Sequence, residues 1–101
     1  MTLEEHRLQL LERIAGCSGA AAARELVREA HFMLVCCDLQ PSTLRQFWEE
    51  LRAALDMLQE ELIYVSDRES KTLRGAVLAA ARVAATGLVN DLEEIPPRAA
   101  I

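Results

Sequence analysis

The chain has 101 residues, of which 51% are hydrophobic but only 4% aromatic, and it carries a formal net charge of −5 at pH 7. This length corresponds to about one domain, and a core built from Leu, Val and Ala favours packed helices over a sheet. The acidic charge argues against broad electrostatic binding to nucleic acid or to an anionic membrane.

The start of the chain does not resemble a signal segment, because residues 1–12 are already charged and amphipathic. We therefore expect a cytoplasmic protein. Cys17, Cys36 and Cys37 are odd in number and two of them are adjacent, which is not the pattern of a disulfide framework. We expect three free thiols that act as small core hydrophobes.

The first predicted helix spans residues 3–15. Thr2 and Glu5 form a capping box, in which the threonine hydroxyl accepts a hydrogen bond from the backbone amide three residues later. Gly16 is predicted to end the helix in the left-handed conformation. The apolar stripe of this helix consists of Leu3, Leu10, Leu11 and Ile14, widened by Leu8.

The second predicted helix spans residues 19–38, with Ser18 as its cap. Its first half is amphipathic, but every residue from 32 to 37 is apolar. A helix without a polar side must be buried on all sides or covered by a partner. The candidate interface therefore comprises Phe32, Met33, Val35 and Cys36, together with Trp48 from the next helix.

The third predicted helix spans residues 43–65 and begins at a cap formed by Ser42 or Thr43. Its apolar residues recur at a period of 3.5, typical of a helix that packs against others along its length. Phe47 and Ala54 broaden this seam, which suits the core of a bundle. The seam consists of Leu44, Trp48, Leu51, Leu55, Leu58, Leu62 and Val65.

The fourth predicted helix spans residues 67–94. A second capping box, Ser66 with Glu69, is predicted to start it, and Pro96 and Pro97 exclude its continuation. Its longest apolar run, residues 75–89, is interrupted by Arg82 and is shorter than the roughly 20 residues of a membrane span, so we expect no membrane contact. The predicted stripe comprises Leu73, Val77, Ala80, Ala84, Leu88 and Leu92, with Ala76, Ala81, Ala85 and Gly87 beside it.

These elements predict an all-α protein: an antiparallel up-down four-helix bundle that associates with itself. Residues 1–95 would form one domain, and residues 96–101 a flexible C-terminal tail. We expect a small non-enzymatic interaction or regulatory module, homodimeric or larger, and leave a further protein partner open.

No catalytic, cofactor or metal site emerges from the sequence, and no small-molecule ligand is evident. His31 and Cys36 are five residues apart, which places them on different sides of a helix, and no Cys-x-x-Cys or His-x3-His spacing occurs. We expect His31 to be structural. Trp48 has no polar constellation around it and is expected to anchor the core or an interface.

Two alternative functions have some support in the sequence. Lys71, Arg74 and Arg82 share one side of the fourth helix and could bind nucleic acid or an acidic partner.

The second alternative is an enzyme. Leu51-Arg52, Leu55-Asp56, Leu58 and Leu62-Ile63, ending in Arg68, resemble the first helix of the small all-helical chorismate mutases. The resemblance covers about 18 of the 101 residues. It implies that Arg52 and Arg68 bind the carboxylates of the substrate.

Overall fold

The protein is described by a computed structural model, which places residues 2–93. These residues form four α-helices and a short 3-10 turn, η1 (Leu62–Tyr64), and contain no strand. The predicted all-α class is confirmed, and the predicted tail, residues 96–101, lies outside the described residues. The helices are α1 (Leu3–Ala15), α2 (Ala20–Cys36), α3 (Pro41–Glu61) and α4 (Arg68–Glu93).

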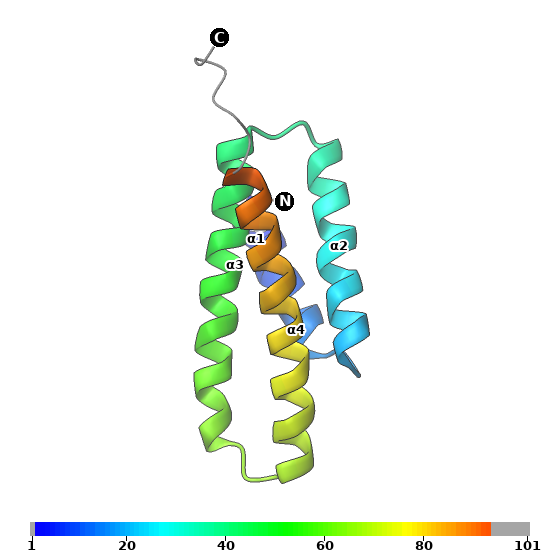
Figure 1. Cartoon of the computed structure of the whole chain (residues 1–101), viewed down its shortest axis with the longest axis vertical. Helices are drawn as coiled ribbons and strands as arrows, with labels where there is room; N and C mark the ends of the chain where they lie inside the picture. The colour runs from blue at the N-terminus through cyan, green and yellow to red at the C-terminus, as the bar shows by residue number, and fades with distance from the viewer. Residues whose placement is uncertain (1, 94–101) are drawn as a thin grey trace.

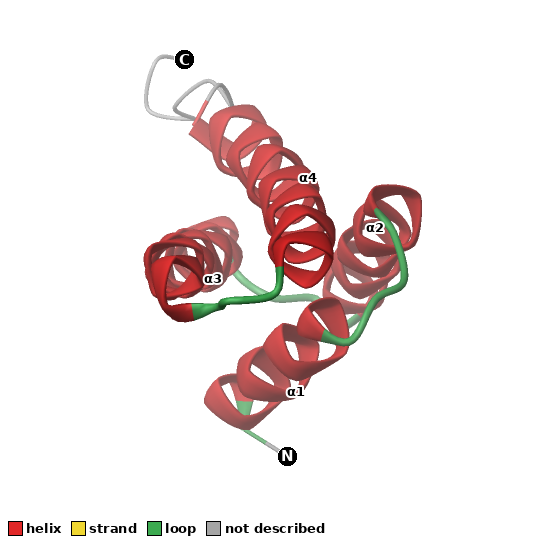
Figure 2. Ribbon diagram, turned by 90° about the horizontal axis from the view of Figure 1, so that it is seen from below, coloured by secondary structure: helices red, strands yellow, loops and turns green. Residues whose placement is uncertain are grey.

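Helix α4 is the central element of the fold, because it packs extensively against both α2 and α3 and also touches α1, whereas α1 makes only small contacts with each of the other helices. In Figure 1, α3 and α4 run side by side along the molecule and are joined at one end, while α2 lies on the other side of α4. Figure 2 shows the molecule from below, with α2 and α3 on opposite sides and α1 and α4 between them. The core therefore lies where α4 meets the other three helices.

The core is apolar, and no described polar or charged residue is buried in it. The predicted seam of the third helix is buried over its first four members and partly buried at Leu58 and Leu62. The buried residues are Leu10, Ile14, Ala23, Val27, Ala30, Leu34, Leu44, Phe47, Trp48, Leu51, Leu55, Val77, Leu78, Ala81, Ala85 and Val89.

The first helix begins as predicted, whereas the second does not. The Glu5 amide donates a hydrogen bond to the Thr2 hydroxyl at 3.1 Å, which confirms the first capping residue. Helix α1 ends before Gly16, but this glycine has a φ of −88° and is not left-handed. Helix α2 is capped by Gly19 without a side-chain hydrogen bond, so the prediction of Ser18 is wrong.

The starts of α3 and α4 differ from prediction because a neighbouring residue caps each helix. Proline occupies the first turn of α3 after Gln40, a position where its missing N–H is not needed, so Ser42 and Thr43 lie inside the helix. At α4, Asp67 Oδ2 accepts from the Ser70 amide at 3.2 Å and from its hydroxyl at 2.6 Å. These bonds lower the pKa of Asp67 below its ordinary value and replace the predicted Ser66–Glu69 box.

The buried side of α4 also differs from the predicted stripe. Val77 is buried as expected, but Leu78 is buried as well and Leu73 is 44% exposed. Because α4 is apolar on most sides and packs against three helices, its sequence period does not single out one inward face.

Helix α4 also has a length and composition that would allow it to cross a membrane, over the 25 residues Arg68–Leu92. The same composition is typical of a core helix in a soluble protein. In this structure α4 contacts each of the other helices.

Candidate interaction surface and pockets

The last two turns of α2 expose the apolar residues that the sequence marks as unusual. The exposed fractions of Phe32, Met33 and Val35 are 70%, 57% and 53%, and Cys36 is exposed too. Helix α2 buries Ala23, Val27, Ala30 and Leu34, and at about 100° per residue Phe32 lies roughly 170° from the middle of that buried side. The phenyl ring therefore points away from the core.

Trp48, the fifth residue of the candidate interface, lies elsewhere. Its exposed fraction is 0%, and its ring meets Phe47 edge-on, with centroids 5.0 Å apart and an interplanar angle of 85°. A side chain enclosed in this way is inaccessible to a partner, so Trp48 belongs to the core and leaves the candidate interface with four residues.

His31 joins α2 to α3 through this tryptophan. Trp48 Nε1 donates to His31 Nδ1 at 3.2 Å. Because Nδ1 accepts a hydrogen bond, it carries no proton, and the neutral imidazole bears its proton on Nε2. Burial lowers the pKa of His31, although the negative charge of Asp91 on α4 acts in the opposite direction. The histidine therefore has a structural role here, as the acceptor for a buried indole.

Two of the three thiols are not the core residues that the sequence predicts, whereas Cys17 packs against the core. Cys36 and Cys37 are exposed, and only Cys17 is partly buried, with its thiol donating to the Arg13 carbonyl at 3.3 Å. The expectation was wrong for the adjacent pair because Cys36 lies roughly 150° from the middle of the buried side of α2, at about 100° per residue, and Cys37 is the cap residue that follows the helix. Among the described residues no group of three or more His, Cys, Asp or Glu side chains could hold a metal ion.

The basic residues of α4 do not form one uniform surface. Arg82 forms an ion pair with Asp56 of α3, which places a negative charge beside it. Arg74 lies at a pocket, and Lys71 is exposed one turn before it. A carboxylate within the cluster weakens its attraction for phosphates.

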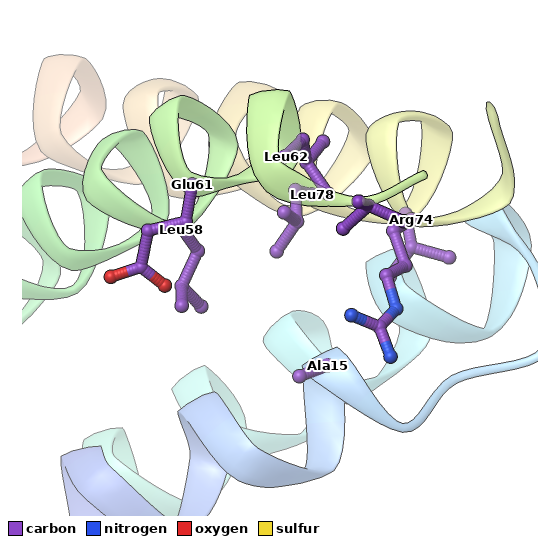
Figure 3. A pocket seen from close by; sticks show the side chains of 8 residues that line it. Ala15, Leu58, Glu61, Leu62, Arg74 and Leu78 are labelled. Atoms are coloured by element: carbon purple, nitrogen blue, oxygen red, sulfur yellow. The ribbon is translucent and has the colours of Figure 1, made fainter. Parts of the chain in front are cut away.

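The pocket beside Arg74 lies between the end of α1 and the joined ends of α3 and α4. Its volume is about 250 Å³. Figure 3 shows the Arg74 guanidinium reaching toward Ala15, with the Glu61 carboxylate at the other end and leucines between them. The lining residues are Ala15, Leu58, Glu61, Leu62, Val65, Arg74, Val77 and Leu78.

The two arginines of the enzyme alternative do not belong to this pocket. Arg52 lies in the middle of α3 and is partly buried, whereas Arg68 is exposed at the first residue of α4. The pocket lies near the end of α3, and Arg52 precedes that end by nine residues, or about 14 Å along the helix axis. Neither side chain is among the residues that line the pocket of Figure 3.

No family model, curated protein or solved structure matches this chain.

Sequence reasoning missed the bond between His31 and Trp48. The available signal was the presence of one tryptophan and one histidine on consecutive predicted helices. It does not identify the pair, because the relative rotation of α2 and α3 decides whether the two rings meet.

Proposed function

We propose that this protein is a small cytoplasmic module for protein–protein interaction, without enzymatic activity, that acts as a homodimer. In this proposal the four helices form an antiparallel up-down bundle that pairs with a second copy. A regulatory role through a further protein partner is compatible with the same arrangement.

The exposure of Phe32 carries the proposal. An apolar helix end must be buried by its own domain or by a partner. The core of this domain lies on the other side of α2, and 70% of the surface of Phe32 is exposed. A partner that covers Phe32 would remove this apolar surface from water, and aromatic side chains are enriched at the centres of protein interfaces.

A second copy suits this surface because residues 31–37 contain no Asp, Glu, Lys or Arg. An uncharged segment can be covered by a second copy without burying an unpaired charge. A symmetric pair also uses the same patch on both chains, which is the commonest arrangement among soluble oligomers.

Light scattering coupled to size-exclusion chromatography tests the proposal. We expect the wild-type protein to elute as a dimer and Phe32→Asp to elute as a folded monomer. Ile63→Asp is the matched control, because Ile63 is 68% exposed and lies on η1 rather than on α2. A wild-type protein that stays monomeric at high micromolar concentration would contradict the proposal.

A further inference from the structure

The side of α2 that faces away from the core carries a repeating pattern of its own. Ala21, Glu25, Arg28, Phe32 and Val35 follow one another at steps of 4, 3, 4 and 3. This is the spacing of a seam along which one helix packs against another. All five side chains are exposed. We call these five residues the outer seam of α2.

The other helices leave the outer seam uncovered. Helices α1 and α2 line one pocket, which Leu26, Ala30 and Met33 border from α2. Helices α4 and α2 line another, which Val27, Arg28 and His31 border from α2, and Arg28 is the one outer-seam residue that borders either pocket. Figure 2 shows α1 and α4 on two sides of α2, with the remaining side at the edge of the molecule.

The order of residues along the outer seam makes it complementary to a second copy of the seam that runs in the opposite direction. One half holds the small Ala21 and the acidic Glu25, and the other holds the basic Arg28 and the large Phe32. The pairs 25 with 28 and 21 with 32 have the same midpoint, between Leu26 and Val27. A single antiparallel register therefore satisfies both pairs at once.

The two charged residues are free to change partners. Within one chain the Arg28 Nη1 atom lies 3.9 Å from Glu25 Oε2, and the two side chains are 79% and 59% exposed. Such an open surface pair contributes little to stability. Both groups can therefore turn toward an opposing helix.

We propose that two copies of this chain associate by antiparallel packing of their outer seams. Each Glu25 then faces the partner's Arg28, and each Phe32 packs over the partner's Ala21. This inference rests on the proposed function, because it specifies the surface and the register of the homodimer. Two chains of net charge −5 repel each other over most of their surfaces, whereas the Glu and Arg of each seam cancel.

Two single charge reversals test the register. In Glu25→Arg both seam charges are positive, and in Arg28→Glu both are negative, so each homodimer would place like charges opposite each other twice. We expect each variant to associate about tenfold or more weakly than the wild type in sedimentation equilibrium. An equimolar mixture pairs opposite charges again and is expected to recover the wild-type affinity to within about threefold. Mixing restores no pair within either chain, so recovery reports contacts between chains.

Glu60→Arg on α3 and Lys71→Glu on α4 are the matched controls. Both positions are exposed, and the two substitutions change the net charge by the same amounts as Glu25→Arg and Arg28→Glu. Circular dichroism checks that each variant is folded, and Glu25→Gln or Arg28→Gln replaces a variant that is not. A monomeric wild type overturns the proposed function itself. A dimeric wild type whose seam variants behave like the controls overturns only the outer seam. Weakened variants that do not recover on mixing overturn the facing of Glu25 and Arg28.

Discussion

The hydrogen bond between His31 and Trp48 should have unequal effects on stability when one or the other partner is replaced. The indole is completely enclosed, with an exposed fraction of 0%, whereas His31 is only partly buried. Replacing His31 with Leu removes the acceptor and admits no new one, so the indole N–H stays buried without a partner. Replacing Trp48 with Phe instead leaves an imidazole that water can reach.

The magnitude follows from this asymmetry. A buried donor that loses its partner costs about 1–3 kcal/mol, more than an average hydrogen bond contributes net. We therefore expect His31→Leu to lower the free energy of unfolding by about 1–3 kcal/mol in the wild-type background. In the Trp48→Phe background the same substitution should cost about 1 kcal/mol or less, because no N–H remains to be satisfied.

Urea unfolding followed by helical circular dichroism measures both costs and avoids dependence on tryptophan fluorescence. All variants are compared at one protein concentration, since self-association shifts apparent stability. His31→Gln is the conservative control, because its side-chain carbonyl can accept the indole N–H and should recover part of the loss. Equal costs of His31→Leu in the two backgrounds would refute the reasoning.

Three further predictions concern other parts of the fold. Because burial lowers the pKa of His31 below 6.5, the folded state binds fewer protons than the unfolded state, so the contribution of neutral His31 to stability is complete above that pH and is lost as pH falls through the folded pKa. In urea titrations across this range, the wild type should lose more stability than His31→Gln. Thr2→Ala removes the cap of α1 and should cost about 0.5–2 kcal/mol, with hydrogen exchange faster in the first turn, whereas Thr2→Ser should preserve the protection. Leu55→Ala empties a fully buried position and should cost about 2–5 kcal/mol in thermal or urea unfolding, and a cost below 1 kcal/mol would contradict its place in the core.

Several parts of the fold follow from the sequence because one local signal points to one answer. The capping pair Thr2 and Glu5 starts α1 at Leu3, and the heptad spacing of α3 places Leu51 and Leu55 in the core. The starts of α3 and α4 were harder to predict, since adjacent residues compete for the same role. Pro41 starts α3 because its preset φ suits the first helical turn, and Asp67 caps α4 through its hydrogen bonds to Ser70.

The candidate interaction surface at the end of α2 could be predicted only in part. The sequence establishes that residues 32–37 lack a polar side and require either burial or a partner. It does not say which, because the answer depends on where α1 and α4 pack around α2. Similarly, Cys36 and Cys37 are of a small apolar residue type that is often buried, yet both are exposed at the end of α2.

The sequence by itself determined that the protein is helical, that the heptad residues of α3 from Leu44 to Leu55 form a buried seam, and that the end of α2 is exceptional. It was wrong about Leu8, which was predicted to widen the stripe of α1 but is 48% exposed. The tertiary structure decided the buried side of α4, the contact between His31 and Trp48, and the exposure of Phe32. The physical reason is that period and composition act within one helix, whereas these features depend on the rotation of one helix against another. Small side chains such as those of α4 allow several such rotations, and only the packing of all four helices together selects one.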